Sequence, residues 1–193
     1  MTIAFVVGNG CSRGQIDISK LASHGTVYAC NAAYRDFFPD YLVAVDKKMV
    51  LEIVEESHYP RSKVWTNAAT NVNHINGINY FEPCRGWSSG PSALLLASDH
   101  GHEAIYILGF DYHGLDNNTK NNNVYAGTRN YRPVTALPTF CGNWLNQTHT
   151  VLQEFPKVKY IRVASDEQFM PEWKNVENFQ HMSIDAFKTS MKC

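Results

Sequence analysis

Short apolar runs rich in Val, Ile and Tyr alternate with helical patterns along most of this chain, and this alternation constrains its fold more than any other feature. Runs of this length and composition are typical of strands that are buried on both faces. Because strands that alternate with helices form parallel sheets with crossover connections, the pattern predicts an α/β fold. The predicted strands are residues 2–7, 26–30, 41–45, 63–66, 78–82, 103–109 and 158–164.

Three predicted helices fit between these strands. Residues 47–57 carry apolar side chains at positions 49, 50, 53 and 54, which form one helical stripe. Residues 89–101 begin with serine, have Pro91 in the first turn and end at Gly101, and these are helix start and stop signals. Residues 143–155 form the third predicted helix.

The length of 193 residues suits a single Rossmann-like domain with a mostly parallel central sheet. We predict that this domain spans residues 1–165. Residues 166–193 show no clear period, and we predict a helical or irregular C-terminal tail packed on the same domain. The asparagine-rich stretch at 116–123 indicates a polar, flexible loop.

Charge and cysteine content limit the classes of partner. The net charge of −1 predicts no broad surface for nucleic acid. Five scattered cysteines without a C-x-x-C pair favour a reducing compartment and argue against a structural zinc site. The apolar runs at 3–7 and 93–97 are too short for a signal peptide or a membrane span. We therefore expect a cytoplasmic protein, and its assembly into a homo-oligomer stays open.

The first predicted strand runs into a glycine-rich turn, VVGNGCSRG, at residues 6–14. Such a turn before a helix lets the backbone approach a phosphate closely. The turn does not match the dinucleotide fingerprint, because Arg13 stands where the third glycine is expected and Asn31 stands where the acidic residue is expected. The alternative is a purely structural turn in which Gly8 and Gly10 adopt positive φ.

Several predicted strands end in glycine or in a polar residue. Ligands of parallel sheets bind beyond the carboxyl ends of the strands, and the helix predicted from residue 89 begins at that same edge. An asparagine there can read a base edge or a ribose, because its amide offers a donor and an acceptor; the alternative is that it caps neighbouring backbone. We predict a nucleotide-binding site formed by Gly8, Asn9, Gly10, Ser12, Asn31, Ser89, Gly90, Gly109, Phe110 and Asp111.

Five short motifs resemble one known superfamily when they are taken in order: GNGCS, ID, VYACNAAY, SSGPSALLLA and IYILGFDY. They resemble the small Rossmann-type bacterial sialyltransferases, glycosyltransferase family 42, and relatives that include archaeal-type 6-hydroxymethylpterin diphosphokinases. The resemblance covers roughly residues 2–165. It implies a glycosyltransferase-like enzyme that uses a nucleotide-sugar based on cytidine monophosphate, requires no metal cofactor, and transfers to an acceptor that the sequence does not identify.

The resemblance also implies roles for the predicted nucleotide-binding residues. Asn9 and Gly10 would lie against the donor phosphate and sugar, and Asn31 would contact the nucleotide. Ser89 and Gly90 would contact a donor carboxylate or phosphate at a helix N-terminus. The cytidine would be framed by Gly109, Phe110 and Asp111.

The candidate catalytic residues are Tyr125, which the resemblance implies, and His113 and Asp46, which stand where this sequence departs from the family. Tyr125 resembles a tyrosine of a mobile loop that supports the leaving phosphate. His113 stands where the family has its first phosphate-binding tyrosine, and we predict that it acts as the base or as a donor to the leaving phosphate. Asp46 replaces a family asparagine, and we predict that it lies near a sugar or acceptor hydroxyl. The histidine base of the family has no counterpart near residues 140–141.

Two other functions stay open at this point. Asp46 and Asp111 both follow predicted strands and could hold Mg²⁺ in a phosphate- or pyrophosphate-transfer enzyme. A non-catalytic nucleotide- or sugar-binding module would explain the missing base, although a long polar lid with Tyr125 and Tyr131 favours an enzyme. The lid cations, Lys120, Arg129 and Arg132, either meet an anionic substrate or are solvated.

Overall fold

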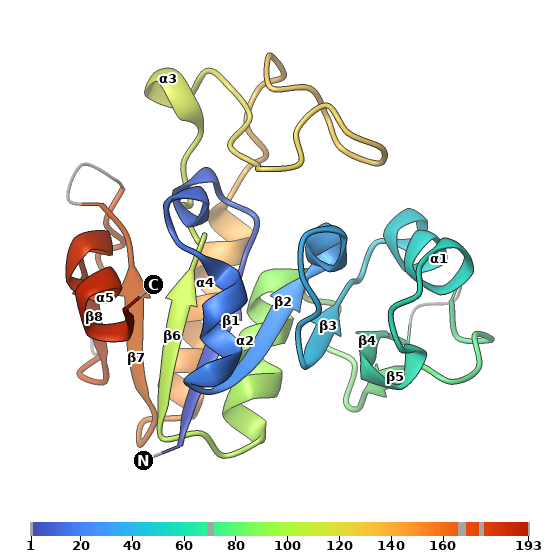
Figure 1. Ribbon diagram of the computed structural model, residues 1–193, viewed down its shortest axis with the longest axis horizontal. Helices are drawn as coiled ribbons and strands as arrows, with labels where there is room; N and C mark the ends of the chain where they lie inside the picture. The colour runs from blue at the N-terminus through green and yellow to red at the C-terminus, as the bar shows by residue number, and fades with distance from the viewer. Residues whose placement is uncertain (1, 69–71, 166–168, 174–175, 193) are drawn as a thin grey trace.

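The computed structural model describes residues 2–68, 72–165, 169–173 and 176–192. Its centre is one eight-stranded sheet, with strand order β5-β4-β3-β2-β1-β6-β7-β8 and parallel pairing throughout (Figure 1). The α/β fold with a parallel sheet is therefore confirmed, and every predicted strand is present. The strands are β1 Ile3–Val7, β2 Thr26–Cys30, β3 Tyr41–Val43, β4 Val64–Asn67, β5 Asn79–Phe81, β6 Ala104–Leu108, β7 Lys159–Val163 and β8 Phe179–Met182.

The three predicted helices are also present, and shorter helical turns join them. Among the described residues, the α-helices are α1 Lys47–Glu56, α2 Ser89–Asp99, α3 Leu115–Asn118, α4 Gly142–Glu154 and α5 Ile184–Met191. The 3-10 turns are η1 Cys11–Gln15, η2 Ile18–Ser23, η3 Asn31–Arg35 and η4 Arg61–Lys63.

The C-terminal tail differs from the expected helical or irregular segment, because residues 179–182 form an eighth strand. This strand, β8, pairs in parallel with β7 at the edge of the sheet. Its sequence, FQHM, is only partly buried and has little of the β-branched character that marks the other strands. Helix α5 follows, and Phe187 packs against Phe5 of β1 with ring centroids 6.3 Å apart. Residues 166–168 and 174–175 of the tail lie outside the described residues.

Side chains of the central strand alternate between two cores, as expected for a sheet covered on both faces. Phe5 and Val7 pack with residues of η2, α1 and α5, whereas Ala4 and Val6 pack with residues of α2 and α4. Helices α2 and α4 contact each other on that second face (Figure 1). Almost all of α2 is buried, which fits its continuous apolar run.

The strand order reverses direction between β1 and β6. From β1 the chain proceeds outward to β5 on one side, and from β6 it proceeds outward to β8 on the other. Residues 113–141, here called the lid segment, cross above the carboxyl ends of the central strands (Figure 1). Parallel sheets bind ligands at such a reversal, so a ligand site is expected at this edge of the sheet. None of the described helices has the length and apolar character needed to cross a membrane.

Candidate functional site

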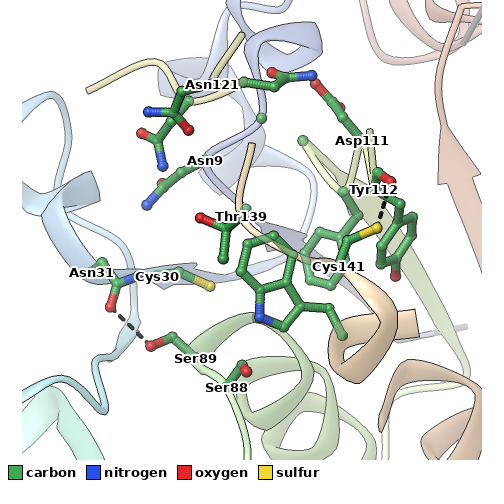
Figure 2. A pocket seen from close by; sticks show the side chains of 18 of the residues that line it. Asn9, Cys30, Asn31, Ser88, Ser89, Asp111, Tyr112, Asn121, Thr139 and Cys141 are labelled. Atoms are coloured by element: carbon green, nitrogen blue, oxygen red, sulfur yellow. Dashed lines mark hydrogen bonds between the residues drawn. The ribbon is translucent and has the colours of Figure 1, made fainter. Parts of the chain in front are cut away.

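A cavity of about 470 Å³ lies at the carboxyl ends of β1, β2 and β6, under the lid segment. This volume is in the range of small-molecule sites. Figure 2 shows that polar side chains from separate segments point into it, among them Asn9, Asn31, Ser89 and Asn121. Eleven of the thirteen predicted site residues line this cavity, namely Gly8, Asn9, Gly10, Asn31, Asp46, Ser89, Gly90, Gly109, Phe110, Asp111 and His113.

Gly8 and Gly10 allow two segments of backbone to approach each other closely. A Cβ atom at Gly8 would lie 2.6 Å from the carbonyl oxygen of Gly109 and 2.8 Å from the Phe110 ring. A Cβ atom at Gly10 would lie 2.4 Å from Cγ of Asp111. Gly109 itself adopts a φ of +67°, which favours glycine. These glycines therefore pack the loop after β1 against the loop after β6, and neither Gly8 nor Gly10 has positive φ.

Several backbone N–H groups of the glycine-rich loop already have acceptors within the protein. Gly10 donates to the Gly109 carbonyl at 2.9 Å, and Cys11 donates to Oδ1 of Asn122 at 2.8 Å. The N–H of Ser12 donates to Oδ2 of Asp111 at 3.1 Å. A phosphate at Cys11 or Ser12 would therefore first have to displace Asn122 or Asp111.

The buried Asp111 side chain holds the loop after β1 in place. Its carboxylate oxygens are therefore not both free to bind a ligand. Its second oxygen accepts the hydroxyl of Ser12, which lies outside the cavity lining. Arg162 of β7 supports the same segment from the sheet, since Nε donates to the Phe110 carbonyl at 2.9 Å. Burial lowers the pKa of Arg162, and the nearby Asp111 and Tyr112 offset this effect. Arg162 was not predicted as a supporting residue. An arginine inside the apolar run VKYIRVA could have indicated a buried polar contact.

Asn31 is oriented by a short chain of hydrogen bonds. The Val45 N–H donates to Ser89 Oγ at 3.2 Å, and the Ser89 hydroxyl donates to Asn31 Oδ1 at 2.8 Å (Figure 2). Asn31 adopts a φ of 53°, a left-handed conformation that asparagine tolerates better than most residues. Because its oxygen is engaged by Ser89, the amide N–H₂ of Asn31 is the group left for a ligand.

The rings of Tyr125 and Tyr131 in the lid segment pack against each other, with centroids 5.5 Å apart, but their hydroxyls have different partners. The Tyr131 hydroxyl accepts from Asn9 Nδ2 and from the Ala32 N–H, both at 3.3 Å. The Tyr125 hydroxyl instead accepts from Arg13 and donates to Asp36, each at 2.6 Å. Tyr125 does not line the cavity, whereas Tyr131 does.

His113 and Asp46 are exposed residues at the rim of the cavity. The His113 ring lies 2.8 Å from the Gly114 carbonyl through Nδ1 and stacks on Phe169. A carbonyl only accepts, so Nδ1 carries a proton and Nε2 of the neutral ring has a free lone pair. Asp46 is the N-cap residue of α1, but its side chain makes no capping hydrogen bond.

Several polar contacts tie the lid segment to the rest of the domain. Asn130 Nδ2 donates to Glu52 at 2.7 Å, and Arg129 pairs with Glu56. The Val124 N–H donates to the Asn9 carbonyl at 2.9 Å. Lys120 pairs with Asp116.

Arg132 differs from the other lid cations. It lines the cavity and has no ion-pair partner in the described part of the chain. Its charge is therefore available to an anion. The sequence analysis left open whether Arg132 meets an anionic substrate, and the structure places it at the cavity. Asn130, Thr139 and Trp144 are cavity residues that were not assigned a site role from the sequence.

Asp46 and Asp111 do not fit a Mg²⁺ site with both carboxylates as ligands. Both carboxylate oxygens of Asp111 already accept hydrogen bonds from Ser12. Among residues 2–68, 72–165, 169–173 and 176–192, no cluster of three His, Cys, Asp or Glu could hold a metal ion.

The chain is similar to a solved structure of the sialyltransferase CstII from Campylobacter jejuni in complex with a substrate analogue, CMP-3FNeuAc. The sequences are 15% identical, the TM-score is 0.47, and the match covers 84% of this chain and 80% of that chain. No protein-family model and no curated protein sequence matches the chain.

Proposed function

We propose that this cavity binds a nucleotide-activated sugar and that the chain is a glycosyltransferase-like enzyme. The observation that carries the proposal is the set of groups at the strand reversal. Oriented asparagines, a helix N-terminus and Arg132, which has no ion-pair partner among the described residues, surround one cavity of nucleotide size. The order of the sequence motifs, which resembles the bacterial sialyltransferases, supports the same choice of substrate class.

The N-terminus of α2 is the best position for the phosphate. Ser89 and Gly90 are the first two residues of this eleven-residue helix, and both line the cavity. Their N–H groups have no acceptor within the helix, and the helix dipole favours an anion there. Arg132 lines the same cavity and adds a positive charge. A phosphate at this position leaves the internally bonded loop at residues 8–12 intact.

His113 is the best candidate for the proton-transfer residue. Its Nδ1 donates to the Gly114 carbonyl, and this contact leaves Nε2 free to accept the proton of an acceptor hydroxyl. In such a transfer the acceptor oxygen forms a bond to the sugar as the sugar–phosphate bond breaks, and the phosphate leaves with that bonding pair. Tyr131 is placed to interact with the ligand, and Asp46 lies at the rim near any incoming acceptor.

The test is turnover of cytidine monophosphate sugars, first with water and then with sugar acceptors, in the presence of excess EDTA. We expect release of cytidine monophosphate that persists in EDTA. Activity that is lost in EDTA and restored by Mg²⁺ would overturn the metal-free proposal. Tight nucleotide binding without any turnover would instead favour the non-catalytic binding module.

A further inference from the structure

Tyr112 directly precedes His113 and has an unusual backbone conformation. Its φ is 55°, in the left-handed region. The other non-glycine residues with positive φ in the described part of the chain are asparagines, Asp116 and Lys192, which is the C-cap residue of α5. Asparagine and aspartate tolerate this region, whereas a bulky residue there is an outlier. Such a conformation persists only where the surrounding structure holds it, and it is found most often at functional sites.

Contacts with α4, β7 and the C-terminal tail hold the buried Tyr112 side chain. Its hydroxyl donates to Oγ1 of Thr148 in α4 at 2.9 Å. Burial raises the pKa of Tyr112, so the hydroxyl keeps the proton that it donates. The guanidinium of Arg162 in β7 lies 5.6 Å from the centre of the Tyr112 ring, and the Trp173 ring lies at its edge with centroids 6.1 Å apart. These contacts fix the ring in the core that also contains residues of α2 and α4.

The backbone around His113 is also held by side chains. The Cys141 thiol donates to the Tyr112 carbonyl at 2.8 Å (Figure 2). Asn122 Nδ2 donates to the His113 carbonyl at 2.8 Å. The contact of the His113 ring with the Gly114 carbonyl keeps the proton on Nδ1 and leaves Nε2 free. This contact therefore depends on the backbone conformation of residues 112–114.

We propose that Tyr112 is the positioning residue of His113. Its anchored side chain holds the left-handed backbone that places the His113 ring at the rim of the cavity, with Nδ1 on the Gly114 carbonyl. Loss of an anchor lets the backbone at residue 112 relax toward a more common conformation, and the His113 ring then leaves this contact. The inference rests on the proposed function and deepens it, because it explains how an exposed histidine keeps Nε2 free to accept a proton.

Thr148 offers the sharpest variants, because it contacts Tyr112 and does not line the cavity. Thr148→Val removes the acceptor of the Tyr112 hydroxyl, whereas Thr148→Ser keeps it. Tyr112→Phe removes the hydroxyl itself. The matched control is Tyr160→Phe, which removes a buried hydroxyl that bonds Ser98 outside the cavity lining.

The first measurement is nitrogen NMR of the His113 ring at a pH where the ring is neutral. It reports which nitrogen carries the proton and needs no turnover. We expect the Nδ1–H form in the wild type, in Thr148→Ser and in the Tyr160→Phe control. Tyr112→Phe and Thr148→Val should move part of the population to the Nε2–H form, which an unrestrained histidine favours.

Three results of this measurement would overturn the inference, whether or not the protein is a glycosyltransferase. One is an Nε2–H form in the wild type. Another is a tautomer that stays unchanged in both Tyr112→Phe and Thr148→Val. The third is an equal change in the Tyr160→Phe control, which would trace the effect to general destabilisation.

The second measurement is turnover of a cytidine monophosphate sugar. We expect Tyr112→Phe and Thr148→Val to lower kcat about tenfold with KM nearly unchanged, because a misplaced active-site group can cost up to about 10²-fold in rate. Thr148→Ser should keep the kcat of the wild type. A raised KM with unchanged kcat in Tyr112→Phe would make Tyr112 a ligand contact and overturn the positioning role. A changed tautomer with unchanged kcat and KM would keep Tyr112 as the residue that positions His113 and would remove His113 from the proposed reaction.

Discussion

Ser12 binds the Asp111 carboxylate twice, through its backbone N–H at 3.1 Å and through its hydroxyl. This contact joins the loop after β1 to the loop after β6 at the strand reversal. We expect Ser12→Ala to lower the free energy of unfolding by about 1–3 kcal/mol, because a buried carboxylate oxygen loses its partner. Urea unfolding measures the change. The control Ser23→Ala removes an exposed hydroxyl and should stay within about 0.5 kcal/mol; equal losses in both variants would contradict the account.

The glycines of the first loop should differ in their tolerance of alanine. Gly10→Ala places a methyl group 2.4 Å from Cγ of Asp111, and we expect a loss of about 1–3 kcal/mol in the free energy of unfolding. Gly14→Ala meets no atom within 4 Å at a residue without positive φ, so we expect a gain of about 0.4–1 kcal/mol. Thermal or urea unfolding of both variants would show the difference. A loop that tolerates alanine at Gly10 would not be packed as described.

Removal of the Asn31 amide should weaken nucleotide binding. Asn31→Gly is the suitable variant, because glycine accepts the φ of 53° at this residue. We expect the binding free energy of cytidine monophosphate to fall by about 1–3 kcal/mol in calorimetry. Ser89→Ala leaves the Asn31 amide without the contact that orients it, and should give a smaller loss. Unchanged affinity in Asn31→Gly would remove Asn31 from the site.

His113 should affect turnover more than binding. We expect His113→Gln to lower kcat by about 10²–10⁴-fold, the usual contribution of a general base, with nucleotide affinity nearly unchanged. His149→Gln, on α4 and outside the cavity lining, is the matched control. Turnover that survives His113→Gln but is lost in Asp46→Asn would make Asp46 the base instead.

The attachment of the lid segment should weaken in acid. Burial acts to raise the pKa of Glu52, but hydrogen bonds from Tyr34, Arg35 and Asn130 outweigh it and hold this pKa below its ordinary value. A lowered pKa in the folded state means that Glu52 stabilises the fold above its unfolded-state pKa of about 4.3. That stabilisation is lost as the pH falls through the lower folded-state value.

Glu52→Gln provides the comparison for this pH effect. The variant should be less stable than the wild type at pH 6, and the difference should shrink as the pH falls toward 3. Urea unfolding at each pH measures it, and hydrogen exchange at residues 128–131 reports whether the lid segment loosens first. A difference that stays constant with pH would contradict the role of the Glu52 charge.

The parallel sheet could be predicted because its strands are short β-branched runs buried on both faces. The run at 3–7 and the run at 104–108 are examples, and their carboxyl ends place Asn9 and Asp111 at one edge. Strand β8 could not be predicted, because a half-buried edge strand needs few apolar side chains.

The positions of the site residues were harder to predict from the sequence than the strands were. Glycines that cradle phosphate and glycines that pack against Phe110 and Asp111 give the same sequence pattern, and only the contacts distinguish them. The choice between Tyr125 and Tyr131 depends on how the lid segment folds back. The course of the lid segment depends on contacts with residues far away in the sequence, such as the hydrogen bond from Asn130 to Glu52. The sequence of the lid segment alone does not predict such contacts.

The central claim is that a nucleotide binds under the lid segment with its phosphate at the α2 N-terminus. Backbone amide NMR during titration of the wild type with cytidine monophosphate tests it most directly. We predict saturable shifts at Asn31, Ser89 and Gly90, with smaller changes at Cys11 and Ser12, whose N–H groups are already bonded within the protein. No saturable shift, or shifts confined to residues 10–12, would contradict it.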